Sequence, residues 1–354
     1  DNEKITIKDE LNVYFEDCMK IVNEFVDSYL RPELQSAIFY NNGQEIKKVK
    51  RKSSVSQLLS DICERVFVYT PRINNELINK NNITAPLFNA RNKVLNALLQ
   101  NELKPNLGLT GSGPEINVMR ATLFSTGIMS ENSTDIKLEE LTPNIQLIID
   151  TIKKFFMSNE GDNSFAKLYE KLVLPENGIG LKMGVIPVFI AAVLHNYKQH
   201  AVILNTSNKE LEIKAETLEN INKVPSAYKF VLEDWNSEKQ EYINELDTLF
   251  RKNIVATERE YNTFDYIVKA MQRWFMNLSK YSREADQAYE GNLEFSKLKV
   301  QIKKFKNQLK GSDINSRELL FGKLPEIFGK QGKDLVKEIK RTKEVLDVML
   351  VNTR

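Results

Sequence analysis

The sequence predicts a mainly α-helical fold, in which helical domains flank a winged-helix-like α+β module. Only 14 Gly and 10 Pro occur among 354 residues, a composition that long helices tolerate better than a many-turned β-sandwich does. Apolar residues recur at three- and four-residue steps through most of the chain. Two β-type runs joined by a polar turn interrupt this pattern near the middle. We expect an N-terminal helical domain over 1–130, the winged-helix-like module with its preceding helices over 131–235, and a C-terminal helical domain over 236–354.

Four helices are expected in the N-terminal domain. One lies in the first forty residues, where an apolar stripe has helical spacing. A second is expected over 54–67, where Ser56 is able to cap it. The other two run from about Thr84 to Leu99 and from Pro114 to Ser125. The stripe of the first helix is formed by Leu11, Phe15, Met19, Val22 and Val26.

The middle domain has a different pattern. After a polar connector come two helices, over 142–157 and 164–173, and a wholly apolar helix over 185–194. The segment 201–214 then predicts a hairpin that turns at Asn205-Thr206-Ser207-Asn208. A short helix and a final strand follow, at 215–224 and 228–234, and from Ser237 onward the pattern is helical again. A helix followed by a hairpin and a flanking strand is typical of winged-helix modules.

Composition and termini favour a cytoplasmic protein without a membrane partner. Cys18 and Cys63 are the only cysteines and have apolar neighbours, so two buried thiols in a reducing compartment are expected. No run of about 18 apolar residues is present, and DNEKITIKDE lacks a signal-peptide core. Because the sequence begins with Asp, we expect a fragment whose parent could carry an activity upstream.

Two glycine-rich segments are candidate phosphate-binding sites, and neither has the residues that its motif requires. The segment 329–334 (GKQGKD) lacks the P-loop spacing, its hydroxyl residue and a preceding strand. The segment 178–184 (GIGLKMG) precedes an apolar helix, as a dinucleotide fingerprint does, but it lacks the strand before it and an acid after the next strand. A structural turn that allows close packing is the better interpretation. No cofactor is therefore expected.

Metal and hydrolase chemistry have few residues available to them. His195 and His200 are the only histidines, and they lie at the end of a helix without nearby cysteines or paired carboxylates. Zinc requires three or four such ligands, and a helix C-terminus itself favours an imidazolium. No serine lies in a nucleophile-elbow motif. The sequence therefore predicts no metal site, no catalytic residue and no enzymatic activity of this segment.

Local basic stretches are the remaining functional signal, because the formal net charge is only +2. Residues 297–310 predict an amphipathic helix in which a lysine stripe lies beside the apolar face of Leu298, Ile302, Phe305 and Leu309. Such lysines could contact DNA phosphates and release counterions, although charge runs are more often solvated faces. The predicted nucleic-acid contacts are Lys47, Lys48, Lys50, Arg51 and Lys52, the hairpin residues Lys209 and Lys214, and the stripe of Lys299, Lys303, Lys306 and Lys310.

Four segments together resemble a known family. Residues 56–99, 107–128 (LGLTGSGPEINVMRATLFSTGI), 178–194 (GIGLKMGVIPVFIAAVL) and 319–329 (LLFGKLPEIFG) are similar, in that order, to the region that follows the P-loop module in large bacterial, defence-associated (BREX-like) ATPases. The resemblance implies a helical and winged-helix-like portion downstream of a nucleotide-hydrolysing domain, a role in anti-phage defence and a link to DNA. The P-loop itself is absent from this sequence, so no nucleotide-binding residue can be assigned.

Three functional hypotheses follow. The first is a non-catalytic binding or regulatory segment of such an ATPase, which contacts DNA or partner subunits of a defence complex. The second is a helical protein-interaction scaffold without a nucleic-acid role, favoured by the near-neutral charge and the many amphipathic helices. The third is an unrecognised enzyme, whose pocket would be sought around Asn74, Asn75, Glu76 and Arg91, although asparagines in turns explain most of that cluster.

Overall fold

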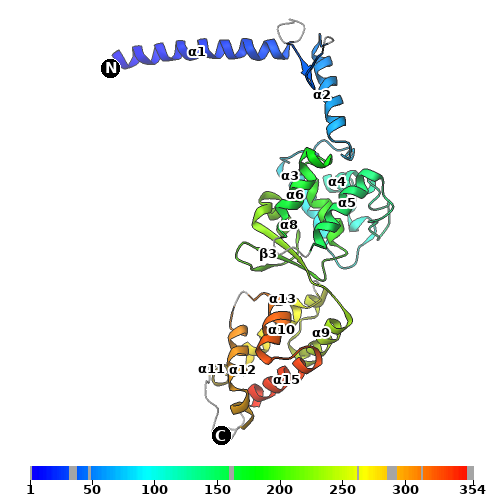
Figure 1. The fold of residues 1–354 in the computed structure, drawn as a ribbon, viewed down its shortest axis with the longest axis vertical. Coiled ribbons are helices and arrows are strands. Elements are labelled where there is room, and N and C mark those ends of the chain that lie inside the picture. Colours follow the sequence, from blue (N-terminus) through cyan, green and yellow to red (C-terminus); the bar gives the residue numbers. More distant parts are fainter. Residues whose placement is uncertain are drawn as a thin grey trace. The chain divides into compact units, whose positions relative to one another are not determined.

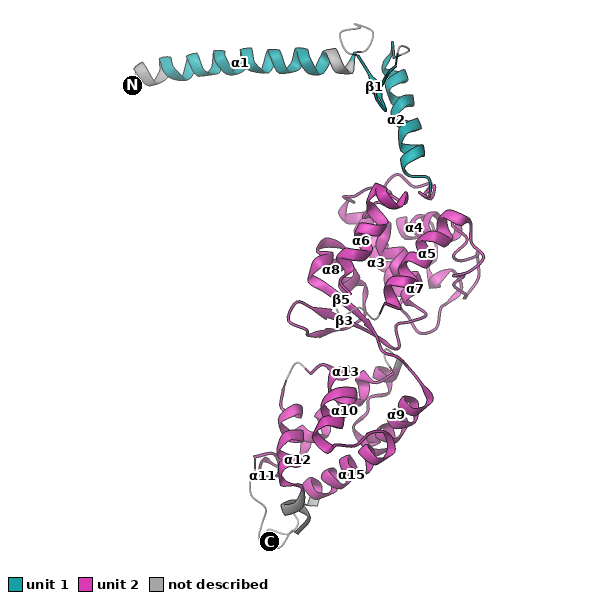
Figure 2. Ribbon diagram, in the orientation of Figure 1, with its two compact units in different colours: residues 1–68 teal, residues 69–354 magenta. Residues whose placement is uncertain are grey.

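A computed structural model describes residues 2–31, 38–46, 49–158, 163–260, 263–284, 293–311 and 314–348. The described chain is mainly helical, with two small antiparallel sheets. It divides into two compact units, residues 1–68 and residues 69–354 (Figure 2). No helix in these ranges is both long and apolar enough to cross a bilayer.

Unit 1 consists of two helices and a small hairpin. Helix α1 spans Asn2–Leu30, strands β1 and β2 span Tyr40–Asn41 and Gln44–Glu45, and helix α2 spans Lys52–Val66. The hairpin turns at Asn42 and Gly43, which both have positive φ, as a two-residue turn between antiparallel strands requires. Helix α2 begins four residues before Ser56, with Arg51 at the N-cap, so the prediction that Ser56 caps this helix is wrong.

The helices of unit 1 bury almost nothing. Helix α2 has no buried residue, and the described side chains of α1 are nearly all exposed. Cys18 and Cys63 are both exposed free cysteines, so the prediction of two buried thiols is wrong. The reason is that the described residues of unit 1 form no buried core against which either helix could pack.

The described residues of unit 2 form two hydrophobic cores, and the first is built mainly from helices. Figure 1 shows how the helices follow one another along the chain. Helix α7 lies at the centre of the first core, and all nine of its residues are buried, because an all-apolar helix has no polar face to turn to water. Short 3₁₀ and π turns connect or extend the helices. The helices are α3 (Ala85–Leu98), α4 (Pro114–Met119), α5 (Pro143–Phe156), α6 (Phe165–Val173), α7 (Ile186–Leu194) and α8 (Ala215–Lys223). The turns are Pro105–Gly108, Arg120–Phe124 and Pro175–Asn177, with Pro225–Ala227 after α8.

A three-stranded antiparallel sheet lies between the two cores. Its strands β3 (Ala201–Asn205), β4 (Glu210–Leu211) and β5 (Tyr228–Leu232) have the order β4-β3-β5. Successive side chains of a strand point to opposite faces. Accordingly Ile203 and its partner Phe230 are buried in the first core, whereas Val202 is buried in the second. The sheet is therefore shared by both cores.

Apart from the contribution of the sheet, the second core is built mainly from helices. Helix α13, a π turn (Leu319–Lys323) and α14 follow one another without a break, and Gly329 ends α14 in the left-handed conformation. The predicted domain boundaries at 130 and 235 stay predictions. The structure shows that the first core continues across residue 130 and that the second begins at Tyr242 apart from Val202. The helices are α9 (Ser237–Phe250), α10 (Asp265–Asn277), α11 (Lys280–Glu284), α12 (Leu293–Leu309), α13 (Ser316–Glu318), α14 (Leu324–Phe328) and α15 (Gly332–Val348), with 3₁₀ turns at Arg251–Asn253 and Ala256–Glu260.

Candidate functional site

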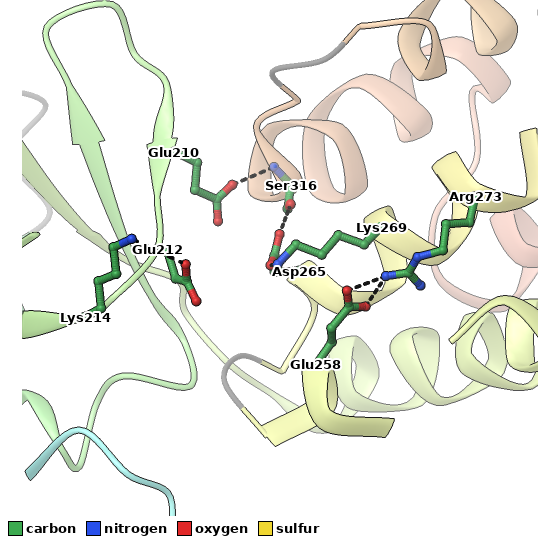
Figure 3. Close-up of polar contacts among 8 residues, drawn as sticks. All are labelled: Glu210, Glu212, Lys214, Glu258, Asp265, Lys269, Arg273 and Ser316. Atoms are coloured by element: carbon green, nitrogen blue, oxygen red, sulfur yellow. Dashed lines mark hydrogen bonds and ion pairs between the residues drawn. The ribbon is translucent and has the colours of Figure 1, made fainter. Parts of the chain in front are cut away.

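A polar cleft lies between the hairpin of β3 and β4 and the helices α10 and α13 (Figure 3). Its volume is about 440 Å³. The hairpin contributes Glu210 and Glu212, and helix α10 contributes Asp265 and Lys269. None of these residues was predicted to belong to a site. No short sequence pattern could have indicated it, since the two sides of the cleft lie more than fifty residues apart in the chain.

Glu210 is the most strongly perturbed carboxyl group in the cleft. One carboxylate oxygen accepts a hydrogen bond from the backbone N–H of Ser316 at 2.6 Å, in the first turn of α13. Burial, reinforced by the negative charge of Asp265, raises the pKa of the Glu210 carboxyl to about 7, while the N–H groups of Ser316 and Arg317 act in the opposite direction. The group is therefore poised to change its charge near neutral pH.

The other charged groups of the cleft form pairs. The Oδ1 atom of Asp265 accepts a hydrogen bond from the Ser316 hydroxyl at 2.7 Å, and its Oδ2 atom lies 2.6 Å from the ammonium of Lys269. Glu258 receives both of its hydrogen bonds from the guanidinium of Arg273. Within the described ranges, no group of three or more His, Cys, Asp or Glu residues could hold a metal ion. Through Ser316, these contacts connect Glu210 of the hairpin to α13 and to Asp265 of α10.

A second carboxylate also holds α13. Glu233 follows β5 directly, is buried, and forms ion pairs with Arg317 of α13 and with Lys239 of α9, the latter at 2.6 Å. Both Glu210 and Glu233 thus come from the sheet and contact the first turn of the same helix. The cleft is therefore framed by contacts that connect the sheet to the second core.

The hairpin lysines lie among acids. Lys209 is exposed at the end of the turn and lines the cleft. Lys214 precedes α8, where its ammonium lies 3.3 Å from Glu216 and 4.0 Å from Glu212. These acids offset the charge of Lys214, which makes the hairpin a weaker cationic surface than the sequence suggested.

The lysine stripe of α12 is only partly exposed. Lys299, Lys303 and Lys310 are exposed, but Lys306 is buried at 2% exposure and donates a hydrogen bond to the carbonyl oxygen of Ser282 at 3.3 Å. The assignment of Lys306 to an exposed cationic stripe is therefore wrong. Lys306 lies four residues after Ile302 and three before Leu309, so it borders the apolar face, and α11 covers it there.

The basic run of unit 1 lies at the start of α2. Lys47 and Lys48 lie outside the described residues. Lys50, Arg51 and Lys52 are exposed, and the first turn of α2 contains no acid and no side-chain cap. Cations at a helix N-terminus oppose the helix dipole. This end of α2 therefore concentrates positive charge.

Arg91 and the asparagines of the third hypothesis lie in different settings. The guanidinium of Arg91 is buried, donates to the Glu219 carboxylate at 2.8 Å from Nε, and also donates to the carbonyl of Gly184 at 2.8 Å. The Oδ1 atom of Asn75 instead accepts from the backbone N–H groups of Leu77 and Ile78 in a local turn. Arg91 is thus engaged in joining α3 to α8, and Asn75 shapes a turn.

His195 and Lys198 both contact carbonyl groups at the C-terminal end of α3. The Nδ1 atom of His195 lies 2.7 Å from the carbonyl oxygen of Leu98, the last residue of α3. Lys198, which burial holds at a pKa of about 8, donates to the carbonyls of Leu99, at 2.8 Å, and Gln100. Both side chains therefore satisfy carbonyl groups that an α-helix leaves without partners at its C-terminus. His200 stacks on Trp235 at a ring distance of 4.5 Å.

The glycine-rich segment 178–184 is a packing element. The backbone N–H of Gly184 donates to the carbonyl of Lys80 at 2.8 Å, and a Cβ atom on Gly184 would lie 2.0 Å from the carbonyl oxygen of Ile78. A side chain has no room here, which supports the interpretation of this segment as a close-packing turn. In the other segment, Gly329 ends α14 and Gly332 begins α15, so the residue run joins two helices.

Helix α1 exposes several large apolar side chains. Ile7, Leu11, Tyr14 and Phe15 are between 56% and 70% exposed, and Ile21 is 67% exposed. Monomeric proteins rarely expose contiguous apolar patches of this kind, and such patches mark interaction sites. The sequence pattern predicted the helix and a stripe that includes Leu11 and Phe15, and the structure shows both side chains exposed.

Comparison of the chain with protein-family models, with curated proteins and with solved structures finds no match. The function must therefore be inferred from the surfaces and contacts described above.

Proposed function

We propose that this chain is a non-catalytic contact segment of a larger ATP-driven machine and that it holds partner subunits through the helices of unit 1. The observation that carries the proposal is the set of exposed large apolar side chains on α1, with exposed fractions of 62% for Leu11 and 70% for Tyr14. The resemblance of four sequence segments to defence-associated ATPases is the reason for proposing an ATP-driven machine. The paired charges in the cleft of unit 2 add support, since they serve contacts within the chain.

A partner that packs against its apolar face would stabilise α1. A helix of 29 residues is about 44 Å long at 1.5 Å per residue. Most helical stability in proteins comes from packing of an amphipathic face. Unit 1 supplies no core for that face. A partner that covers the stripe would remove several large side chains from water, at roughly 25 cal/mol per Å² of apolar surface.

Site-specific photocrosslinking tests this function. In one variant, a benzoylphenylalanine residue replaces the exposed Tyr14 on the apolar side of α1. In the control variant it replaces the exposed Glu16, on the opposite side of the helix. The full chain is expressed in the cells from which it comes and irradiated. We expect covalent protein adducts from position 14 and none from position 16. Equal adducts from both positions, or none from position 14, would contradict the proposal.

DNA binding is a second candidate function, favoured by the basic start of α2. Lys50, Arg51 and Lys52 surround a helix N-terminus whose N–H groups and dipole also attract anions, so a phosphate would find both in one place. On α12, the exposed lysines 299, 303 and 310 offer a second set. A winged-helix-like contact is part of this proposal. The hairpin and Lys209 would make this contact. Helix α7, which precedes the hairpin, would not contact DNA, because every one of its residues is buried.

Titration of duplex DNA at increasing salt concentrations tests the second candidate. Neutralising n phosphate contacts gives a slope of log K against log salt of about −0.9n. We expect replacement of Lys50, Arg51 and Lys52 by alanine to reduce that slope by up to about 2 to 3. Lys340→Ala is the matched control, because its ammonium lies 3.9 Å from Glu344 on an exposed helix surface. No binding at low salt would remove DNA as a partner.

A further inference from the structure

A row of apolar residues on α1, which shares Leu11 with the predicted stripe, has the spacing of a coiled-coil seam. Counting from Ile7, apolar residues follow at alternating steps of four and three, at Leu11, Tyr14, Cys18 and Ile21, and the next step reaches Phe25. This alternation is the pattern with which one helix packs its side chains between those of a second helix. The seam from residue 7 to residue 25 covers about 27 Å of helix. A helix is therefore the shape of partner that fits this face.

Acidic residues line one side of the seam. Glu10, Asp17 and Glu24 recur every seven residues, each just before a seam residue, and all three are exposed. None of the three forms an ion pair with a described residue. Over residues 6–27 the helix carries six acidic and two basic residues, a formal charge of −4. In helix pairs, charged residues beside the seam pair across the interface and decide which partner is accepted.

A second copy of α1 fits this charge pattern poorly. Two antiparallel copies would place the acidic columns against each other, and like charges would repel across the interface. Two parallel copies would place each column beside Phe15 and Val22 of the other helix, because these residues flank the opposite side of the seam. The carboxylates would then lose water without gaining a cation. Charge complementarity therefore favours a basic partner.

We infer that α1 docks an amphipathic helix of a partner protein whose apolar stripe is flanked by lysine or arginine. This inference rests on the proposed function and adds the chemistry of the partner. The apolar seam supplies the affinity, and the column of Glu10, Asp17 and Glu24 selects the basic flank.

Two synthetic helical peptides of four heptads test the inference. They share leucine and isoleucine at the seam positions and differ at the flanking positions, which are lysine in one peptide and glutamate in the other. The fluorescently labelled peptides are titrated with the full chain, and anisotropy is measured at 50 and 300 mM NaCl, concentrations chosen at roughly the two sides of physiological ionic strength. We expect the lysine peptide to bind about tenfold more tightly than the glutamate peptide at low salt, because three lysine–carboxylate pairs attract in the first complex and three pairs of carboxylates repel in the second.

Two variants of the full chain complete the test. Glu10→Lys with Asp17→Lys and Glu24→Lys should reverse the preference, so that the glutamate peptide binds more tightly. Leu11→Ala with Ile21→Ala should weaken both peptides, since it shortens the seam but keeps helix propensity. All five positions are exposed, so both variants leave the cores of unit 2 unchanged. Circular dichroism verifies that the helix content is retained.

Three results would overturn the inference. One is equal affinity for both peptides, and another is the absence of binding to the lysine peptide. The third is a dimer of the chain alone in analytical ultracentrifugation that Leu11→Ala with Ile21→Ala dissociates, because the occupant would then be a second copy. Photocrosslinking at position 14 distinguishes this failure from failure of the proposed function. Adducts with another protein, found together with no binding of the lysine peptide, would exclude a basic helix as the partner but would keep the proposed contact with a partner subunit.

Discussion

The carboxylate of Glu210 accepts a hydrogen bond from the backbone N–H of Ser316, 106 residues later in the chain, at 2.6 Å. The first N–H groups of an α-helix have no partner within the helix. Asn315 satisfies one of them locally, since its Oδ1 atom accepts from the N–H of Glu318 at 2.9 Å. Glu210 satisfies another from strand β4. The hairpin therefore caps a helix of the second core.

Burial of the Glu210 carboxyl group should make stability depend on pH near neutrality. The pKa of Glu210 is about 7 in the folded chain, against an ordinary value of 4.5, so between these values the folded state binds more protons than the unfolded state. The free energy of unfolding should therefore fall as pH rises from 4.5 to 7, by about 3 kcal/mol at most. The contribution is fully present below pH 4.5 and lost above about 7. Urea denaturation at a series of pH values measures it.

Glu210→Gln isolates that contribution. The amide keeps a carbonyl oxygen that can accept the N–H of Ser316, but it does not titrate. We expect the variant to lose this part of the pH dependence and to be more stable than the parent chain at pH 7.5. Glu326→Gln, at an exposed position of α14, is the control and should leave the pH profile unchanged. An unaltered profile in Glu210→Gln would contradict the assignment.

Gly184→Ala should destabilise unit 2 by about 2 to 3 kcal/mol, because its Cβ atom would overlap the backbone carbonyl of Ile78. The free energy of unfolding from urea denaturation measures the effect. Gly322→Ala is the matched control, since its Cβ atom would meet only the side chain of Glu318, at 4.0 Å. In that helical setting alanine should leave stability unchanged or raise it by up to about 1 kcal/mol. Similar losses in both variants would show that close packing at Gly184 is not the cause.

Removing one member of the buried pair of Arg91 and Glu219 should be severe. Both side chains are 3% exposed, so Arg91→Met leaves a buried carboxylate without its cation and should cost about 3 to 5 kcal/mol. Adding Glu219→Leu to Arg91→Met should recover part of the loss, because the unpaired charge is then absent. In the exposed pair of Lys340 and Glu344, Lys340→Met should change stability by less than about 0.5 kcal/mol. A double variant that is less stable than Arg91→Met would contradict this account.

Charge reversal should distinguish Lys306 from Lys303 on α12. Lys306→Glu would place a carboxylate in a buried site beside the carbonyl of Ser282, and we expect a loss of about 2 to 4 kcal/mol in the free energy of unfolding. Lys303→Glu, at an exposed position, should change stability by less than about 0.5 kcal/mol. Thermal and urea denaturation compare the two variants. Equal stability would show that Lys306 is not buried in solution.

Local sequence patterns predicted most of the elements of unit 2. The predicted helices over 142–157 and 164–173 correspond to α5 and α6, and the predicted hairpin corresponds to β3 and β4. These features depend on the spacing of apolar residues and on turn residues, which act over a few positions. The winged-helix-like arrangement asks for more, because it specifies how helices and strands combine, and it remains a proposal.

The candidate sites were less accessible to sequence reasoning. The partners of Glu210 and Arg91 lie 106 and 128 residues away, and a single sequence contains no signal that links positions so far apart. For Lys306, the predicted position on the surface of α12 was correct, but the predicted exposure of its side chain was wrong. Whether a residue at the edge of an apolar face is covered depends on the neighbouring element, here α11.

Most helices and the central hairpin could be predicted from the sequence, because apolar periodicity and turn chemistry are local properties. The seam and the acidic column of α1 need only the geometry of a single helix, so they follow from the sequence once the helix is known. The tertiary structure alone decided which polar groups are buried, which acids share a cleft, and which apolar stripe lies on a core and which faces water. These outcomes depend on contacts between segments far apart in the chain, and both the desolvation of a charge and the burial of a stripe exist only once those segments meet.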